Sequence, residues 1–235
     1  RSIIRVVKFS VILQARMGSK RLPGKVMKII DKKNPLIFYV ISQLKQSTKI
    51  QNIIVATTVL KEDDEIEAYA KKLGVDVFRG DDNDVLDRYY NCAKKFRISN
   101  IIRITSDNPL IDPFIIDAAI NKFSSENVDF LTNCFPRTFP YGTEVEIFSF
   151  KALEKIKKLV HCTDEKEHVT LYFYNHPKQF KITNLSNIID LSKFRWTVDE
   201  KEDFNRVQKI IKKIPKTPIL TEDIINLISK KQNTL

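Results

Sequence analysis

The chain has 235 residues, of which 43% are hydrophobic and 29% charged, a composition typical of a soluble globular protein with a sizeable core. No stretch of 18 uncharged apolar residues occurs, so the sequence predicts neither a transmembrane helix nor a membrane partner. The formal net charge of +11 fits a phosphate-rich partner or a generally lysine-rich composition. Because no DNA- or RNA-binding signature accompanies this charge, we expect no nucleic acid partner.

Short apolar runs alternate with amphipathic stretches through the first half of the chain. The runs predict β-strands, and apolar residues at helical spacing predict helices between them. The strands are expected at residues 6–13, 53–58, 75–78, 100–105 and 128–132. The helices are expected at residues 35–44, 62–73 and 84–96, and from Pro113 onward. This alternation predicts an α/β fold with a doubly wound, mostly parallel sheet.

The second half is less regular. Residues 143–148 alternate as in a strand at a sheet edge or in an appended hairpin, and residues 180–184 and 194–198 also resemble strands. Helices are expected at residues 163–175, 200–213 and 221–230. Because no linker or repeat interrupts the chain, we expect a single domain over residues 1–235, with a small β-hairpin/helix appendage in its second half.

The cysteines are Cys92, Cys134 and Cys162. Their number is odd and none belongs to a CxxC pair, which argues against a disulfide framework and against structural zinc. Arg5 and Lys8 interrupt the apolar stretch that a signal peptide would need. We therefore expect a cytoplasmic protein.

A basic, glycine-containing segment follows the first predicted strand at residues 14–25. It contains Gly18 and Gly24, and its cations are Arg16, Lys20, Arg21 and Lys25. Glycine lets the backbone approach a ligand closely, and successive N–H groups together with cations can hold phosphate oxygens. The spacing excludes both the P-loop and the dinucleotide fingerprint. The segment predicts a phosphate-binding loop of another kind, with a basic surface turn as the alternative.

Two aspartates each follow a predicted strand. Asp107 comes after residues 100–105, and Asp199 after residues 194–198. Open α/β sheets bind ligands beyond the carboxyl ends of their strands, and Mg²⁺ prefers a few carboxylates with phosphate oxygens and water. The pair therefore predicts a magnesium site. The alternative is that each residue only forms a turn or caps a helix, although Asp112 is the better cap for the helix at Pro113.

Residues 79–88 join a short strand to a helix and include Asp82-Asn83-Asp84, which spells DxD. In glycosyltransferases of a related fold, this motif binds a metal and a sugar nucleotide. The alternative is a solvated acidic turn with Asp84 near the helix N-cap.

Residues 137–146 combine an arginine, aromatic residues, a glycine turn and two acids. Glu144 and Glu146 are expected on one face of a strand. Such a group can hydrogen-bond sugar hydroxyls, and a hairpin with exposed acids is the alternative.

The pattern A-R-x-G-S-x-R-L-P-G-K stands unbroken from Ala15 to Lys25. It resembles the opening of the cytidylyltransferases that activate acidic sugars, of the acylneuraminate and 3-deoxy-manno-octulosonate type. It is most similar to the spore-coat polysaccharide biosynthesis cytidylyltransferase-like proteins. The resemblance continues at residues 79–80, 84–89, 107–111, 167–170 and 197–199, and so covers nearly the whole chain.

The resemblance implies a nucleotide-diphospho-sugar transferase-like fold that moves CMP from CTP to a sugar acid or related acceptor, with release of pyrophosphate. Catalysis is expected of Arg16, Lys25 and Asp107, with Mg²⁺ held by Asp107 and Asp199. Nucleotide binding is expected of Gln14, Ala15, Gly18, Ser19, Arg21, Arg79, Asp84 and Arg88. For Arg79 and Arg88, the equal alternative is that they are surface ion-pair partners. Acceptor binding is expected of Arg137, Tyr141, Glu144 and Glu146. Related enzymes are commonly dimers, so a homodimer is expected.

Some alternatives stay open from the sequence. Many relatives have Asp where this chain has Glu144, which leaves the acceptor undefined, and the cytosine preference depends on the resemblance alone. His168 is expected to pack or to lie at a dimer interface. A glycosyltransferase that uses Asp82 and Asp84 is the main alternative function, and a non-catalytic nucleotide sensor is another.

Overall fold

The structure is a computed structural model that describes residues 9–232. Residues 6–8 of the first predicted strand, with Arg5 and Lys8, lie outside the described residues. Within this range no helix is long and apolar enough to cross a membrane. Cys92, Cys134 and Cys162 are all free thiols.

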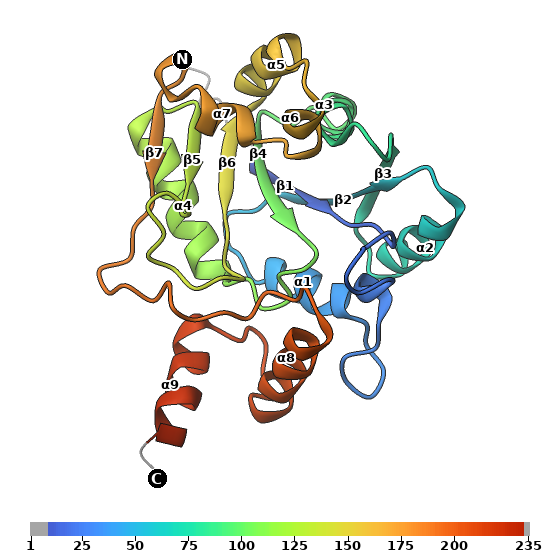
Figure 1. Cartoon of the computed structure of the whole chain (residues 1–235), viewed down its shortest axis with the longest axis vertical. Helices are drawn as coiled ribbons and strands as arrows, with labels where there is room; N and C mark the ends of the chain where they lie inside the picture. Colours follow the sequence, from blue (N-terminus) through green and yellow to red (C-terminus); the bar gives the residue numbers. More distant parts are fainter. Residues whose placement is uncertain (1–8, 233–235) are drawn as a thin grey trace, which may run out of the picture.

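The described residues contain a seven-stranded sheet with the order β3-β2-β1-β4-β6-β5-β7 (Figure 1). The strands are β1 Phe9–Gln14, β2 Asn52–Thr58, β3 Asp76–Gly80, β4 Asn100–Thr105, β5 Phe130–Thr132, β6 Glu146–Ser149 and β7 Ile182–Asn184. β6 runs antiparallel to both of its neighbours, and the other pairings are parallel. The predicted α/β class with a mostly parallel sheet is therefore confirmed.

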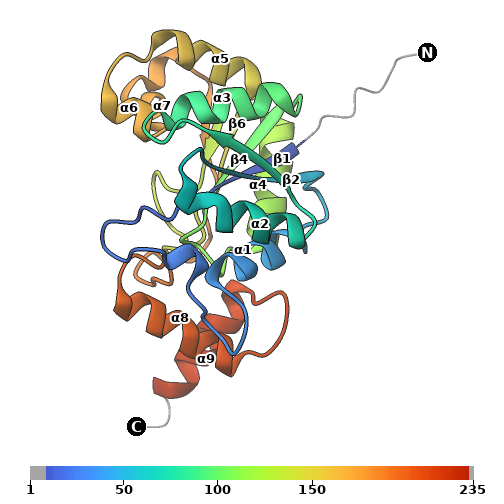
Figure 2. The ribbon, with the colours of Figure 1, turned by 90° about the vertical axis from the view of Figure 1, so that its right-hand side faces the viewer.

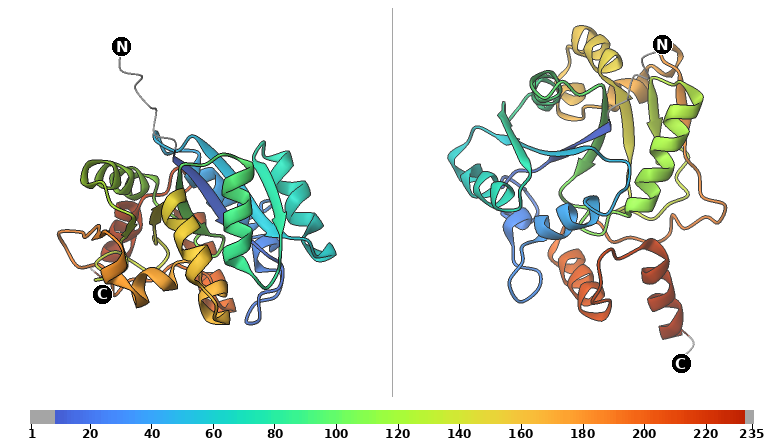
Figure 3. Two further views of the ribbon diagram at one scale, coloured as in Figure 1. Left: turned by 90° about the horizontal axis from the view of Figure 1, so that it is seen from above. Right: turned by 180° about the vertical axis from the view of Figure 1, so that it is seen from behind.

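Helices cover both faces of the sheet (Figures 2 and 3). They are α1 Leu36–Leu44, α2 Asp64–Lys72, α3 Val85–Lys95, α4 Pro113–Glu126, α5 Phe150–Leu159, α6 Thr163–Glu167, α7 Leu171–Asn175, α8 Lys201–Lys213 and α9 Thr221–Gln232. Short 3₁₀ turns lie at Lys25–Met27, Lys61–Asp63 and Pro177–Gln179. One apolar cluster joins a face of the sheet to α1, α2, α4 and α8, and a second joins the opposite face to α3, α5 and α7.

Local chemistry explains several helix ends. The Asp112 carboxylate accepts from Phe114 N at 2.9 Å and so caps α4, with Pro113 in the first turn, as the sequence predicts. Asp84 caps α3 by accepting from Asp87 N. Glu200 and Asp203 form a reciprocal capping box that starts α8.

The second half differs from the expectation in three places. The strand expected at residues 143–148 is β6, which lies inside the sheet between β4 and β5 rather than at an edge or in an appended hairpin. Residues 194–198 form no strand, and Arg195 makes only an isolated bridge to Tyr141. The helix expected at residues 163–175 is interrupted between α6 and α7, where Val169 and Thr170 are buried.

Helix α5 is missing from the sequence prediction. Ser149 caps it by accepting from Ala152 N at 3.0 Å, and Leu153 and Ile156 bury its apolar face. A serine followed by apolar residues at helical spacing was the available signal.

A buried ion pair ties β6 into the sheet. Arg103 Nη1 of β4 lies 2.7 Å from Glu146 Oε2 of β6, and both side chains are less than a fifth exposed. The Glu146 carboxylate also accepts from Thr170 Oγ1 at 2.9 Å and Tyr174 Oη at 2.7 Å. Glu146 therefore links two strands to the segment that carries α7.

Replacing Glu146 with alanine would leave the Arg103 guanidinium buried without its counter-charge. We expect the free energy of unfolding to fall by about 3–5 kcal/mol, measured by urea denaturation. The control is Glu126→Ala, which removes an exposed pair with Lys122 and should change stability little. Equal losses in the two variants would contradict this role of Glu146.

Candidate active site

The basic loop leaves the sheet at a point where the chain changes direction. β1 and β4 are adjacent, and the chain continues from β1 towards one edge of the sheet and from β4 towards the other. Crevices at such positions, beyond the carboxyl ends of the strands, are where open α/β sheets bind ligands.

The loop is held by Asp63, which is fully buried. Its carboxylate accepts from Met17 N at 2.7 Å and from both the N–H and the hydroxyl group of Thr58. Gly24, with φ of +66°, adopts a left-handed conformation and donates its N–H to Met17 O at 3.0 Å. The loop is thereby folded back on itself and tied to the end of β2.

The two predicted carboxylates converge on one ammonium group, Asp107 from the end of β4 and Asp199 from the end of the irregular segment 194–198. Lys25 Nζ lies 3.9 Å from Asp107 Oδ2 and 3.6 Å from Asp199 Oδ1, and it donates to Val198 O at 2.6 Å. Val198 N donates to Asp107 O at 2.8 Å, which joins the two segments directly. Residues from three distant segments of the chain are thus brought to one point beside the loop.

Asp199 is surrounded by further cations. Arg21 Nη2 lies 2.8 Å from its Oδ1, and Arg195 Nη2 lies 2.5 Å from its Oδ2. The N-cap of α8 is Glu200, so Asp199 is not occupied in capping that helix. Its carboxylate is available for chemistry once a cation moves away.

The donor set fits a magnesium ion that takes its remaining ligands from substrate phosphates and water. Asp107 and Asp199 lie within 4 Å of the same ammonium, the place that a second cation would share or take over. Among the described residues no group of three or more Asp, Glu, His or Cys side chains could hold a metal by itself. Two carboxylates are the number that magnesium sites with bound phosphates commonly use.

The two other cations of the loop face outward. Arg16 Nη2 lies 3.8 Å from Glu167 Oε1 of α6, at the border of an ion pair, and both side chains are partly exposed. Lys20 is exposed at the tip of the loop. Both groups can turn towards a phosphate without losing a buried partner.

Arg88 of α3 lies fully buried behind the loop. Its Nη1 donates to Asp81 O at 2.8 Å, whereas its Nε and Nη2 have no partner among the described residues. Burial lowers the pKa of its guanidinium, and the nearby charge of Arg16 acts in the same direction. An incompletely satisfied cation beside a phosphate loop is suited to an anion.

Arg79 and Asp84 both make contacts with other protein groups. Arg79 donates to Thr58 O and Leu60 O and pairs with Asp64 and Glu67. Its guanidinium is therefore already bonded to protein groups near the end of β2. Asp84 caps α3 and lies 3.7 Å from Lys157 Nζ. These contacts favour the acidic-turn interpretation of Asp84 over a metal-binding DxD.

The remaining predicted loop residues lie where β1 opens into the loop. Gln14 ends β1, and its buried Oε1 has no partner among the described residues. Ala15 donates its N–H to Ala56 O, so this N–H is not available to a ligand. A Cβ at Gly18 would lie 3.4 Å from Glu62, and Ser19 Oγ accepts from Leu22 N at 3.4 Å.

The expected acceptor residues divide into two groups. Arg137 Nη1 lies 2.7 Å from Glu144 Oε1, and Asn108 Nδ2 lies 3.1 Å from Glu144 Oε2, directly beside Asp107. Burial raises the pKa of Glu144, although Arg137 and the Gly142 N–H oppose this. The Arg137 guanidinium stacks at 3.9 Å over the ring of Tyr141, which is 40% exposed.

Glu146 lies apart from this group. Its oxygens accept from Arg103, Thr170 and Tyr174, and its side chain is 8% exposed. Both carboxylate oxygens therefore have internal partners, so the structure favours a structural role for Glu146 rather than the acceptor contact predicted from sequence.

Three further site residues escaped the sequence analysis. Asp63 supports the loop, Asn108 joins the Asp107 turn to Glu144, and Arg195 clamps Asp199 while its guanidinium lies 5.6 Å from the Tyr141 ring. Asn108 and Arg195 stand beside or near the predicted aspartates, which was a usable signal. Asp63 belongs to an acidic run that resembles an ordinary helix start, so nothing local marked it.

This fold and site define a nucleotidyltransferase: an α/β sheet with a basic loop and a convergent carboxylate pair at its switch point. Residues 10–235 match the family model described as cytidylyltransferase, and the chain therefore belongs to the cytidylyltransferase family.

Relatives support this assignment. The chain is 33% identical over 227 residues to the spore coat polysaccharide biosynthesis protein SpsF of Bacillus subtilis, covering 93% of each. It is 37% identical over 222 residues to an uncharacterized protein of Methanocaldococcus jannaschii, covering 93% of this chain and 89% of the relative. It is 30% identical over 155 residues to 3-deoxy-manno-octulosonate cytidylyltransferase 2 of Hydrogenovibrio crunogenus, covering 64% and 60%.

Solved structures agree. A cytidylyltransferase from Leptospira borgpetersenii superposes with a TM-score of 0.92 at 37% identity, covering 97% of this chain and 96% of that one. A CMP:2-keto-3-deoxy-manno-octonic acid synthetase complexed with CTP has a TM-score of 0.67 at 16% identity, covering 88% and 99%, and shows the shared fold.

Asp63→Asn tests the loop support. The amide has one acceptor oxygen and cannot serve both Met17 N and the Thr58 groups, so a buried donor loses its partner. We expect a loss of about 1–3 kcal/mol in the free energy of unfolding, together with weaker binding of CTP and Mg²⁺ in calorimetric titration. The control is Glu65→Gln, which changes an exposed carboxylate of α2 that has no ion-pair partner among the described residues. Unchanged CTP affinity in a destabilised Asp63→Asn protein would restrict Asp63 to a stability role.

Proposed function

We propose that the protein transfers CMP from CTP to a sugar acid or a related small anionic or sugar-like acceptor, with release of pyrophosphate, in surface polysaccharide or glycoconjugate biosynthesis. The observation that carries the proposal is the convergence of Asp107, Asp199 and Lys25 beside the basic loop. The relatives named for 3-deoxy-manno-octulosonate transfer and for spore coat polysaccharide biosynthesis support the substrate class.

The nucleotide is bound by the loop. Gly18, Ser19 and the end of β1 at Gln14 and Ala15 surround the triphosphate, while Arg16 and Lys25 neutralise the charge that grows on pyrophosphate. Arg88 supplies a buried positive charge from behind the loop. Arg79 and Asp84 act less directly, Arg79 by holding the end of β2 and Asp84 by starting α3.

The acceptor lies between the Asp107 turn and residues 137–144. Arg137 and the Tyr141 ring offer a cation and an apolar face, and Glu144 offers acceptor oxygens for hydroxyl groups. Asn108 connects Glu144 to the turn that carries Asp107, which fixes the position of the acceptor side relative to the two aspartates.

In the reaction, a hydroxyl oxygen of the acceptor attacks the α-phosphorus of CTP in line. The new P–O bond forms as the bond to the β-phosphate oxygen breaks, pyrophosphate leaves, and the hydroxyl proton passes to solvent. Catalysis rests on positioning and charge neutralisation. Asp107 and Asp199 would hold a magnesium ion, which when bound would supply Lewis-acid polarisation of the α-phosphate.

Arg21 has two roles, one before and one after the nucleotide binds. Without nucleotide it pairs with Asp199, although its side chain is 59% exposed. A triphosphate offers this guanidinium several anionic oxygens, so Arg21 moves to the phosphates and frees Asp199 Oδ1. Arg195 stays on Oδ2 and keeps the carboxylate in place.

The proposal also includes a single catalytic domain, a homodimeric assembly and a cytoplasmic location. The mutual packing of one sheet and its helices supports a single domain. The free cysteines are in keeping with a reducing compartment. Neither nucleic acid nor membrane is proposed as a partner.

Asp107→Ala and Arg16→Ala test the catalytic roles. Removing a contact to developing charge typically costs about 10²–10³ in rate, and the loss of a metal ligand adds to this, so turnover should be abolished while the fold survives. The measurement is pyrophosphate release from CTP with candidate sugar acids, with circular dichroism to verify folding. Asp82→Ala, which changes the first acid of the DxD sequence, should retain activity. Normal turnover in folded Asp107→Ala protein would refute the proposal, and loss of activity only in Asp82→Ala would favour a glycosyltransferase.

Nucleotide preference can be measured by thermal stabilisation with CTP, UTP, ATP, GTP, CDP and UDP, each with and without Mg²⁺. A ligand at about 100 times its dissociation constant should add about 2.7 kcal/mol, and we expect the largest shift for CTP with Mg²⁺. A larger shift with UDP or CDP would contradict this and favour use of a nucleotide sugar.

A further inference from the structure

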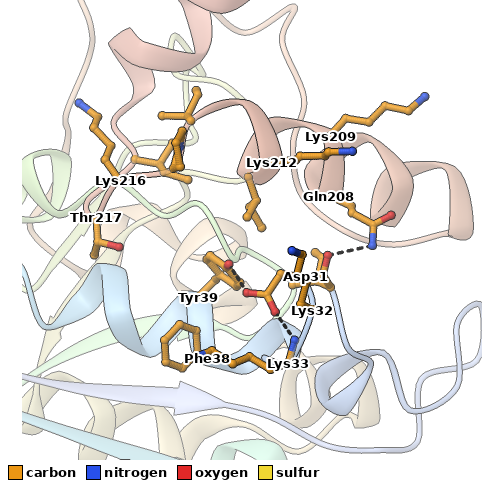
Figure 4. Close-up of a pocket in the computed structure, with 15 residues that line it drawn as sticks. Asp31, Lys32, Lys33, Phe38, Tyr39, Gln208, Lys209, Lys212, Lys216 and Thr217 are labelled. Atoms are coloured by element: carbon orange, nitrogen blue, oxygen red, sulfur yellow. Dashed lines mark hydrogen bonds between the residues drawn. The ribbon is translucent and has the colours of Figure 1, made fainter.

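A cavity of about 940 Å³ lies between the start of α1 and the end of α8 (Figure 4). None of its lining residues belongs to the candidate active site. One wall carries Phe38 and Tyr39 of α1 together with Lys32 and Lys33 of the segment that precedes it. The other wall carries Gln208, Lys209 and Lys212 of α8. The volume falls in the range of small-molecule sites, about 300–1,000 Å³.

The floor of the cavity is apolar and recessed. Its apolar residues are Ile30, Phe38, Tyr39, Ile211, Ile214 and Ile219. Ile30, Ile211 and Ile219 are less than a tenth exposed, and the others are partly buried. Gln208 Nε2 donates to Ile30 O at 2.8 Å and fixes the two walls relative to each other.

The one acid in the lining is already satisfied. Asp31 accepts from Tyr39 Oη at 2.5 Å and from Lys33 N at 2.7 Å (Figure 4). It also accepts from the backbone and side-chain nitrogens of Asn34. Partial burial acts to raise the pKa of Asp31, but these hydrogen bonds outweigh it and lower the pKa, so the group stays ionised and internally bonded.

The rim is cationic. Five lysines line the cavity: Lys32, Lys33, Lys209, Lys212 and Lys216. Lys216 pairs with Asp223 at 2.8 Å. Within residues 9–232, no carboxylate pairs with any of the other four. These lysines differ from the cations of the active site, since Arg21 and Lys25 have carboxylate partners at hand.

We propose that this cavity is a second binding site, for a small phosphate monoester that carries an apolar group. The apolar group lies on the recessed floor, and the phosphate meets the ammonium groups of both walls. The charge and the floor together select this chemistry: a phosphate alone would leave the apolar floor exposed, and an uncharged apolar molecule would leave the lysines repelling one another.

The shape favours a single molecule over a membrane surface. Membrane-binding faces place apolar side chains beyond their cations, so that they enter the bilayer. Here the lysines stand at the exposed rim and the apolar residues lie below them. A flat anionic bilayer would therefore contact the cations without filling the cavity.

The test uses the whole protein and 1-naphthyl phosphate as the probe, titrated by calorimetry with and without saturating CTP and Mg²⁺. We expect one probe per chain in both conditions, and weaker binding of 1-naphthol and of inorganic phosphate. The variant Lys32→Glu/Lys212→Glu reverses one charge on each wall and should weaken probe binding by about tenfold or more. The matched control, Lys151→Glu/Lys158→Glu on α5, has the same net charge and should bind like the unmodified protein.

Each other outcome overturns the site. Equal weakening in both double variants would mean a response to net charge alone. Displacement of the probe by CTP would place it in the nucleotide site. Inorganic phosphate that binds as tightly as the probe would mean a plain anion site, and binding only to anionic vesicles would mean a surface role. Because the cavity test does not require turnover, its failure is distinct from failure of the proposed reaction.

Discussion

The ammonium group of Lys25 is the point on which the geometry of the candidate active site depends. It lies between Asp107 and Asp199 and donates to Val198 O, so three segments distant in sequence meet at one cation. The Lys25 side chain is only 14% exposed, and a cation removed from water in this way needs nearby anions and carbonyls. The same requirement that fixes the lysine also brings together the two carboxylates that a magnesium ion would use.

The reversed strand β6 gives the site its second half. Because β6 runs antiparallel to β4 and β5, its amino end lies beside the carboxyl ends of the parallel strands. The residues that lead into it, including Glu144, therefore arrive beside Asn108 and Asp107. The buried Arg103–Glu146 pair holds this reversed strand in place, which gives Glu146 a structural reason to be there.

The positively charged side chains lie in two different kinds of environment. At the active site, Arg21, Lys25 and Arg195 are held by acids that a nucleotide can displace or that a metal can share. At the cavity beside α8, four lysines stand over an apolar floor without such partners among the described residues. The first arrangement suits a reaction that exchanges partners, and the second suits a ligand that brings its own charge.

The sequence by itself determined the α/β class, the strand at residues 100–105, the basic loop from Gln14 to Lys25, and the choice of Asp107 and Asp199 as candidate metal ligands. These features depend on short-range patterns, such as apolar periodicity, glycine positions and helix caps, which a single sequence displays. Only the tertiary structure decided that β6 lies inside the sheet, that residues 194–198 form no strand, and that Asp63 supports the loop. It also placed Glu144 beside the Asp107 turn and Glu146 in a buried ion pair, and it formed the cavity between α1 and α8. Each of these depends on contacts between distant segments, and local periodicity carries no information about which distant segment will supply the partner.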